Sequence, residues 1–340
     1  MLLPTKLSRL ARIFFDFKRR KEIAGALPIR LWIETASCCN LRCVMCPNKS
    51  VPGADKGLMK LDLFKKIVDE ARSFVSDAYL HHRGEPLMNP ALFDMIRYAK
   101  AAGIKTRFHS NGTLLTEEKA RQLLEAGPDM VSFSVDGFTK ASYEQVRIGG
   151  TFEKTVENVL RLAALRREGG FQRPYIIIEK IRFKNPEPTS QQDEVAALRR
   201  RFLEAGVDEI IEKEEYVWAE ASAPEAAESP VCSACTFPWY AMVICFDGKV
   251  TPCPQDFHAY MTLGDVNTSS LKEIWNGEPY RQLRRRFATD IGSLALCRKC
   301  DRLTRKTVGG VPLQYMITFL TDQLVGYSKL RKLMGSHERN

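Results

Sequence analysis

The 340-residue chain has no hydrophobic run long enough for a membrane-spanning helix. Such a helix needs about 20 mostly apolar residues. It also lacks a cleavable signal peptide, because the basic N-terminal segment has neither a clean apolar core nor a small-residue cleavage site. No internal repeat of useful strength is found, which argues against a repeat architecture. We therefore expect a cytoplasmic, non-repetitive protein.

The body of the chain has no excess of positive charge, although the net charge is +10. Residues 1–30 carry +6 and residues 302–340 carry +5, so the remaining 271 residues carry about −1. A domain that grips nucleic acid carries its basic excess in its body. We therefore expect no specific nucleic-acid partner, and the basic ends need their own explanation.

Both ends of the chain are amphipathic as well as basic. Apolar residues follow one another at helical spacing and are surrounded by Lys and Arg. The N-terminal stripe consists of Leu3, Leu7, Leu10, Phe14 and Phe17, and the C-terminal stripe of Leu313, Met316, Leu320, Leu324 and Tyr327. Such a helix either packs on the rest of the protein or lies on an anionic membrane surface. The sequence leaves both interpretations open.

The ten cysteines are clustered, which favours metal binding in a reducing compartment over disulfides. Three of them form a C-x3-C-x2-C pattern immediately after a strand-like run, namely Cys39, Cys43 and Cys46. Three thiolates this close can hold one cubane iron–sulfur cluster and leave its fourth iron open to a ligand. The alternative is a zinc site, but zinc normally takes four ligands in paired C-x2-C knuckles.

Strand-like and helix-like runs alternate between residues 29 and 217. The strand candidates are 29–35, 78–82, 105–109, 130–135, 175–182 and 209–217, and the helix candidates are 61–74, 90–102, 116–126, 152–167 and 191–205. Consecutive β-α units predict a parallel sheet with helices on its outer side. Because the crossovers are right-handed, the sheet curls. We therefore predict an α/β fold with a partial, TIM-like (β/α)6 barrel.

The remaining segments differ from this alternating core in composition. Residues 219–231 are rich in Ala, Ser, Pro and Glu and are predicted to be a linker. Residues 232–303 form a small cysteine-bearing domain with strand-like pieces around Cys235, Cys245 and Cys253 and a helix over residues 271–287. The predicted layout is a basic segment 1–28, a barrel 29–218, the linker, the small domain and a basic tail 304–340.

The C-x3-C-x2-C motif after a strand resembles the signature of the radical S-adenosylmethionine (SAM) superfamily. The resemblance implies that Cys39, Cys43 and Cys46 bind a [4Fe–4S] cluster whose open iron chelates SAM. It also implies that one electron, from a donor such as flavodoxin or ferredoxin, cleaves SAM to methionine and a 5′-deoxyadenosyl radical. The implied fold is a partial (β/α)6 barrel open at one side, as the alternating pattern predicts.

Further motifs at the predicted strand ends match positions that contact SAM in that superfamily. The residues implied are Met45, Gly84, Glu85, Ser110, Asn111, Ser134, Asp136 and Arg147. Met45 departs from the aromatic residue often found at its position, but a thioether can still pack on adenine. The structural alternatives are ordinary turns at Asn111-Gly112 and Asp136-Gly137, and a solvated helix arginine at Arg147.

The second cysteine group resembles the auxiliary-cluster extension of the SPASM/twitch subgroup. The implied ligands are Cys235, Cys253, Cys297 and Cys300, with Cys232 and Cys245 as competitors for the first position. No cysteine follows Cys300, so we expect one auxiliary [4Fe–4S] cluster. A zinc knuckle is the alternative for the last pair.

These patterns predict a radical SAM enzyme that abstracts a hydrogen atom from a carbohydrate-like or other small molecule. Four protein ligands leave the auxiliary cluster no open iron, so it would accept an electron, which favours net oxidation. The alternatives are epimerisation with Cys245 as the hydrogen donor, modification of a ribosomally made peptide, and a non-catalytic, metal-stabilised basic protein that binds other molecules.

Several polar residues near the ends of barrel strands are candidates for contact with the substrate. His81 and His82 are adjacent, so only one of them can point into the barrel. His109 ends the third predicted strand, and Glu179 and Lys180 lie on the fifth.

Overall fold

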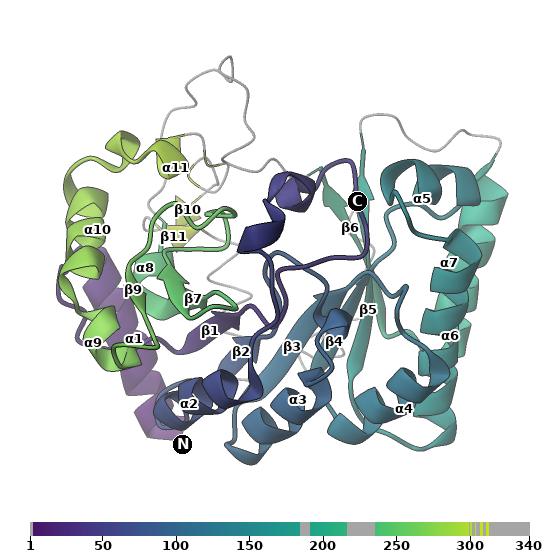
Figure 1. The fold of residues 1–340 in the computed structure, drawn as a ribbon, viewed down its shortest axis with the longest axis horizontal. Helices are drawn as coiled ribbons and strands as arrows, with labels where there is room; N and C mark the ends of the chain where they lie inside the picture. Colours follow the sequence, from purple (N-terminus) through teal and green to yellow (C-terminus); the bar gives the residue numbers. More distant parts are fainter. Residues whose placement is uncertain are drawn as a thin grey trace.

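A nine-stranded sheet forms the centre of the computed structural model, which describes residues 3–183, 191–215, 235–298, 300, 303, 307–308 and 311–312. The strand order is β6-β5-β4-β3-β2-β1-β7-β8-β9 (Figure 1). Six strands run parallel to their neighbours in chain order, namely β1 (Arg30–Ile33), β2 (Asp77–Tyr79), β3 (Lys105–Ser110), β4 (Met130–Ser134), β5 (Tyr175–Arg182) and β6 (Glu209–Glu214). β6 and β9 are the two edges, so the sheet does not close.

Helices connect these strands and cover the outer face of the sheet (Figure 1). They are α2 (Leu61–Ala71), α3 (Leu92–Ala101), α4 (Glu117–Ala126), α5 (Lys140–Val146), α6 (Phe152–Glu168) and α7 (Gln192–Ala205). The predicted α/β fold with a partial (β/α)6 barrel is confirmed. Because parallel strands end at the same side of the sheet, the loops that follow them gather at one mouth of the barrel.

Alternation along each strand separates the outer core from the inside of the barrel. On β5, Ile176 and Ile178 belong to the large core beneath the helices, whereas Ile177 packs with Met130 and Tyr175 on the inner face. Successive side chains of a strand point to opposite faces, which explains this division. Inward-facing positions can therefore be read from the register.

Three local predictions were wrong. β2 ends at Tyr79 instead of residue 82, because the chain leaves the ladder there and turns towards the cysteine loop. α5 was missed, since seven residues are too few for a clear period; a capping box between Thr139 and Ser142 starts it. The helix predicted over residues 271–287 is two helices, α9 (Leu271–Trp275) and α10 (Glu278–Thr289). The break falls at Gly277, and a proline begins the second helix.

The C-terminal part extends the barrel sheet on the other side of β1. β7 (Ala241–Ile244) pairs in parallel with β1, and β8 (Lys249–Thr251) and β9 (Gly264–Asp265) continue the sheet antiparallel. A short helix α8 (Phe237–Tyr240) precedes β7, where the sequence predicted a strand-like piece. The other elements are α11 (Ala295–Arg298), β10 (Thr307–Val308) and β11 (Val311–Pro312).

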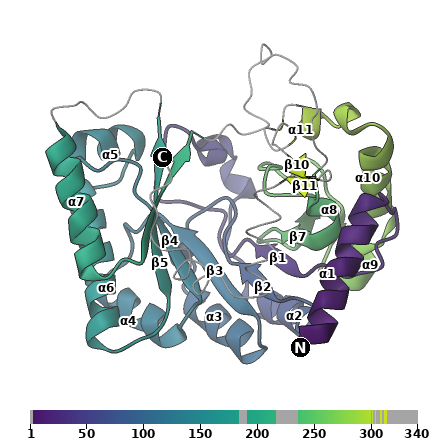
Figure 2. The ribbon, with the colours of Figure 1, turned by 180° about the vertical axis from the view of Figure 1, so that it is seen from behind.

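The N-terminal amphipathic segment forms helix α1 (Leu3–Lys18), which runs alongside α9 and α10 in both ribbon views (Figures 1 and 2). Leu10 and Phe17 of the predicted stripe are buried, whereas Leu7 and Phe14 are exposed. Two of the four stripe residues whose side chains are described thus pack on the protein, and Trp239 Nε1 anchors the turn after α1 by donating to Lys21 O at 3.0 Å. The C-terminal stripe lies outside the described residues.

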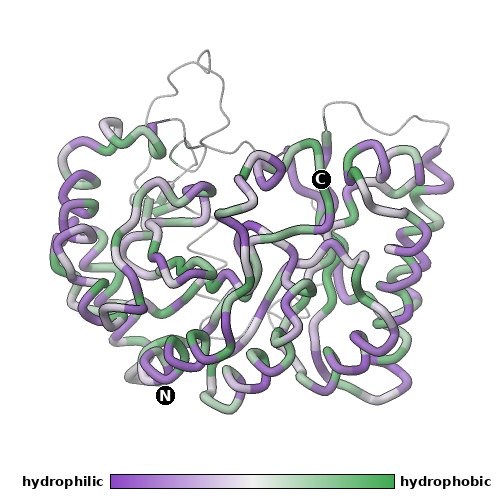
Figure 3. The backbone as a smooth tube through the Cα atoms, in the orientation of Figure 1, coloured by the Kyte–Doolittle hydropathy of each residue, from purple (hydrophilic) through white to green (hydrophobic). Residues whose placement is uncertain are grey.

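Hydrophilic and hydrophobic residues alternate along the helices at the rim of the molecule (Figure 3). This alternation is typical of helices with one buried face. Among the described residues, no helix combines the length and the apolar character that crossing a bilayer requires.

Replacing Phe17 by Ala should lower the free energy of unfolding by about 3–5 kcal/mol, as for other buried aromatic residues. Phe17 is 2% exposed and packs against the Trp239 ring at a centroid distance of 5.6 Å. The matched control is Phe14→Ala on the same helix, where the ring is 45% exposed, and its effect should stay within about 0.5 kcal/mol. Anaerobic urea unfolding measures both; equal effects would mean that α1 does not pack as described.

Candidate active site at the carboxyl ends of the strands

The loop that follows β1 carries the three clustered cysteines and is fixed on two sides. Asn48 Nδ2 donates to Ser37 O at 2.7 Å and to Arg83 O at 2.9 Å, which ties the loop to the end of β2. On the other side, Arg42 N donates to Ile148 O at 2.9 Å, which ties it to the segment after α5. The loop is therefore held in one conformation by backbone groups from different units of the barrel.

The thiols of Cys39, Cys43 and Cys46 lie together at the mouth of the barrel. Burial raises the pKa of Cys39 to about 12, and Glu85 and the other two cysteines contribute to this rise. Burial also raises the pKa of Cys46. Three thiolates this close repel one another, so they can coexist only around a positively charged partner, and iron supplies that charge. The donor set fits an iron–sulfur cluster.

Two side chains donate towards the sulfur atoms. Arg147 Nη1 lies 3.6 Å from Cys43 Sγ, and Asn111 Nδ2 lies 3.8 Å from Cys39 Sγ. Both donors were predicted as SAM-binding residues. Hydrogen bonds to sulfur ligands tune the potential of an iron–sulfur cluster, so these two residues are placed to act on the cluster.

Gly84 lies directly against the backbone that leads into the cysteine loop. A Cβ atom at this position would be 2.3 Å from Cys38 O and 2.6 Å from Ala36 O. Glu85 N donates to the same Cys38 O at 2.9 Å. The close approach that glycine allows here is to the cysteine loop itself.

Glu85 joins the ends of β2 and β3. Its buried carboxylate accepts hydrogen bonds from Ser110 Oγ at 2.8 Å, Asn111 N at 2.7 Å and Leu87 N at 3.0 Å. Burial raises the pKa of this carboxyl group, although the three hydrogen bonds oppose the rise. Glu85 therefore places Ser110 and Asn111, both of which are predicted to contact SAM.

Asn111 also connects to a residue that the sequence prediction missed. Its Nδ2 donates to Asn40 Oδ1 at 3.0 Å, and its Oδ1 accepts from Thr113 Oγ1 at 2.7 Å. Asn40 Nδ2 closes the network by donating to Thr113 Oγ1 at 2.8 Å. Asn40 follows Cys39 directly, so its position inside the cysteine motif was the available signal.

Asp136 and Arg147 form a buried ion pair beside Cys43. Burial raises the pKa of Asp136 despite the nearby guanidinium, and the attraction of Asp136 and Cys43 raises the pKa of Arg147 against the cost of burial. Arg147 is thus not a solvated helix arginine. Ser134 lies two residues before Asp136 and pairs with Glu179 in the strand register. Met45 is half-buried in the cysteine loop.

The second cysteine group converges on one pocket in the C-terminal part of the chain. Its lining includes Cys235, Cys253, Cys297 and Cys300. The walls are largely apolar, with Phe237, Leu283 and Phe287 among them. Burial raises the pKa of Cys297, and the other three cysteines add to the rise. Four such thiols around one space fit a cluster with no open iron.

Cys232 and Cys245 were the alternatives to Cys235 as the first ligand of the auxiliary cluster. Cys245 does not line this pocket; it follows β7 and is 1% exposed, next to Glu34 and His82. Cys232 lies outside the described residues. Although Glu34, His82 and Cys245 bring three ligand atoms within 4.8 Å of one another, the Glu34 carboxylate already accepts from Arg83 Nε and Nη2, both at 2.6 Å. A guanidinium on this carboxylate disfavours a metal ion there.

Inside the barrel, His81 and His109 face each other near the same mouth. Their rings stack with centroids 4.3 Å apart, and His109 Nδ1 lies 3.5 Å from Glu179 Oε2. Lys213 Nζ pairs with Glu179 Oε1 at 2.8 Å. His81, not His82, is therefore the member of the adjacent pair that belongs to the inner wall.

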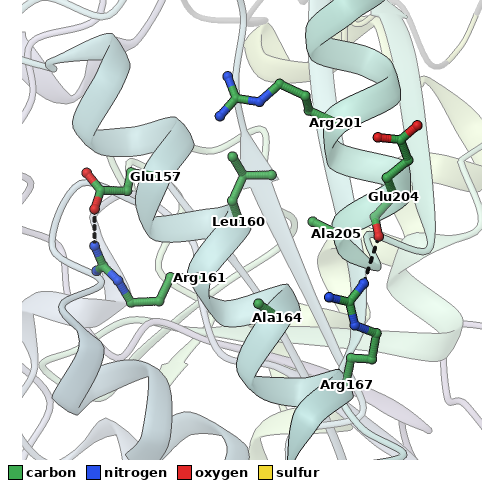
Figure 4. A pocket seen from close by; sticks show the side chains of 8 residues that line it. All are labelled: Glu157, Leu160, Arg161, Ala164, Arg167, Arg201, Glu204 and Ala205. Atoms are coloured by element: carbon green, nitrogen blue, oxygen red, sulfur yellow. Dashed lines mark hydrogen bonds and ion pairs between the residues drawn. The ribbon is translucent and has the colours of Figure 1, made fainter.

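A separate surface pocket lies between α6 and α7 (Figure 4). Its charged side chains bond to nearby helical groups: Arg161 Nη2 pairs with Glu157 Oε1 at 2.7 Å, and Arg167 Nη1 donates to Glu204 O at 2.9 Å. It contains none of the predicted site residues. The chemistry therefore belongs at the mouth of the barrel.

Comparison with known families agrees with this site. Residues 33–179 match the radical SAM superfamily, and residues 235–301 match the SPASM iron–sulfur cluster-binding domain. The chain belongs to the radical SAM superfamily, and it binds a [4Fe–4S] cluster, SAM and an auxiliary iron–sulfur cluster.

Several characterised relatives are similar to the chain. It is 30% identical over 317 residues to the tungsten-containing aldehyde ferredoxin oxidoreductase cofactor-modifying protein of Pyrococcus furiosus, covering 80% of this chain and 86% of that protein. It is 35% identical over 129 residues to the AdoMet-dependent heme synthase of Methanosarcina barkeri, covering 38% and 37%. The mycofactocin maturase MftC of Mycobacterium tuberculosis is 30% identical over 195 residues, covering 57% and 46%.

Solved structures show the same fold at low sequence identity. BtrN in complex with AdoMet and 2-DOIA has a TM-score of 0.54 at 18% identity, covering 81% of this chain and 93% of that one. Streptococcus suis SuiB bound to precursor peptide SuiA has a TM-score of 0.58 at 14% identity, covering 90% and 79%. These likenesses concern the fold alone.

Replacing Gly84 by Ala should displace the cysteine loop, because the new Cβ would overlap backbone oxygens that cannot move aside. We expect the iron content to fall from about eight to about four per chain as the SAM-binding cluster is lost. The control is Gly53→Ala, where a Cβ meets nothing within 4 Å. Iron and sulfide analysis with circular dichroism measures both variants; full iron content in the Gly84 variant would contradict the packing argument.

Proposed function

We propose that this enzyme removes a hydrogen atom from a small molecule and completes a net two-electron oxidation. The observation that supports it is the pocket lined by Cys235, Cys253, Cys297 and Cys300. A cluster held by four cysteines has no iron left for a substrate, so electron transfer is the chemistry open to it.

Cys39, Cys43 and Cys46 hold the cluster that binds SAM in this proposal. SAM, cleaved by one electron from a donor such as flavodoxin or ferredoxin, supplies a 5′-deoxyadenosyl radical that abstracts hydrogen. The protein contributes position: Glu85 fixes Ser110 and Asn111, and Asp136 fixes Arg147. The charge of Arg147 suits the carboxylate of SAM. Gly84, Ser134 and Met45 complete the set of residues proposed to contact SAM.

The relatives favour a cofactor as the substrate class within this proposal. A relative that matches 80% of the chain is a cofactor-modifying protein, and another relative is a heme synthase. The cofactor extracted from tungsten-containing aldehyde ferredoxin oxidoreductase is therefore the first probe, with carbohydrate-like compounds as the second. Epimerisation through Cys245 is the weaker proposal, because that thiol is only 1% exposed.

Replacing Cys43 by Ala should abolish SAM cleavage. Replacing Cys297 by Ser should retain the slow cleavage of SAM that occurs in the absence of substrate. Each variant should keep about four of about eight irons, because each removes one cluster. Anaerobic reconstitution, iron counting and 5′-deoxyadenosine measurement after dithionite reduction check this prediction.

The matched controls are two cysteines that are not proposed as cluster ligands. Cys38→Ala, next to Cys39, and Cys245→Ala, outside the auxiliary pocket, should both retain all the iron. SAM cleavage by the Cys43 variant would refute the radical enzyme. A wild-type protein that cleaves SAM with only about four irons would keep the radical enzyme but remove the auxiliary acceptor.

A further inference from the structure

The inner wall of the barrel carries a polar group that neither cluster nor the SAM-contacting residues use. It consists of His81 after β2, His109 on β3, Glu179 on β5 and Lys213 on β6. The side chains of His109 and Glu179 are 27% and 14% exposed, so they are reachable from the mouth of the barrel. This group lies at the level of the predicted SAM residues: His109 precedes Ser110, and Glu179 pairs with Ser134 in the strand register.

The groups that face the ring nitrogens assign a different tautomer to each imidazole. The backbone N–H of His109 donates to His81 Nδ1 at 3.3 Å, so His81 carries its proton on Nε2. His109 Nδ1 faces Glu179 Oε2 at 3.5 Å and therefore carries its proton on Nδ1. A neutral imidazole has one donor and one acceptor nitrogen. The stacked pair thus offers a donor at His81 Nε2 and an acceptor at His109 Nε2.

The charges around the pair keep this arrangement at neutral pH. Burial lowers the pKa of both His81 and His109, and Lys213 lowers both further; His82 and His109 also lower that of His81. Glu179 opposes the shift at His109. Although burial opposes its charge, the attraction of His109 and Lys213 lowers the pKa of Glu179 to about 2. Glu179 is therefore ionised and both imidazoles are neutral.

We infer that His81 and His109 bind the O–H or N–H group on the reacting carbon of the substrate, and that His109 accepts its proton. His81 donates to the heteroatom while the heteroatom donates to His109 Nε2. Glu179 stabilises the imidazolium that forms, as a carboxylate does behind a catalytic histidine. The substrate class is therefore a compound whose reacting carbon carries a hydroxyl or amino group.

This inference rests on the proposed function and completes its balance. The carbon loses one hydrogen atom to the 5′-deoxyadenosyl radical and one electron to the auxiliary cluster, while its O–H or N–H bond loses a proton to His109. The product has a C=O or C=N double bond. Loss of the proton makes the remaining radical a stronger reductant, so a base at this point promotes transfer of the electron.

The first test needs no substrate. Two-bond 15N–1H spectra of oxidised holoenzyme labelled at histidine, assigned with H81Q and H109Q, report the tautomers directly. We expect His109 protonated on Nδ1 and His81 on Nε2 at pH 7, and loss of the single His109 tautomer in E179Q. The control is E212Q. Glu212 is adjacent to Lys213, but its side chain pairs with Arg182 and Arg199 instead of joining the inner cluster. A wild-type His109 protonated on Nε2, or charged, would overturn the inference.

The second test is turnover with the extracted tungsten cofactor as the probe. H109Q should lower the amount of product formed per 5′-deoxyadenosine by about 10²-fold or more, the usual effect of losing a general base. Product formation should fall by a smaller factor in E179Q, and it should not change in E212Q. Product formation by the wild type should fall as the pH drops through the pKa of His109, because only the neutral imidazole accepts a proton.

The outcomes separate the two proposals. Wild-type product formation by H109Q refutes the proton acceptor but leaves the radical oxidation intact. Failure of the wild type to form 5′-deoxyadenosine, or to hold the auxiliary cluster, refutes the proposed function. The tautomer measurement tests the donor and acceptor roles of His81 and His109 whether or not the proposed function holds.

Discussion

A buried carboxylate connects the two cluster-bearing parts of this enzyme. Glu34 follows β1 and is fully buried; it accepts two hydrogen bonds from the Arg83 guanidinium after β2 and one from Phe246 N after β7. Three neighbouring strands therefore share one anchor at their carboxyl ends. Burying two charges is costly unless they are paired and fully hydrogen-bonded, and this pair meets that condition. Because the Arg83 carbonyl also accepts from Asn48, the cysteine loop depends on the same contact.

The same principle organises the rest of the mouth. Glu85 and the pair of Asp136 and Arg147 are buried charged groups whose partners come from other strand ends. Each interaction is made within the protein, so these groups are oriented by the fold. A site built in this way resists rearrangement, which favours radical chemistry because the reactive species and its target are held in one geometry. Positioning, more than acid–base power, is what these residues supply.

The sequence predicted those parts of the site that depend on spacing. The cysteine patterns and the alternating units led to the fold, the cofactors and the strand ends. It did not predict Glu34, Asn40 or Arg83, because their roles depend on contacts between segments far apart in the chain. It left His81 and His82 undecided, since the choice follows from where β2 stops. The inner cluster of His81, His109, Glu179 and Lys213 becomes visible only once the register places the strands side by side.

The parallel pairing of β7 with β1 also protects the protein against aggregation. β1 lies inside the sheet only because residues 241–244 cover its second edge. Without them its backbone N–H and C=O groups would form an open strand edge, and such edges recruit strands from other molecules. The C-terminal unit thus shields the barrel from association with other copies of itself. The two parts of the chain cannot be separated without exposing the strand that leads into the cysteine loop.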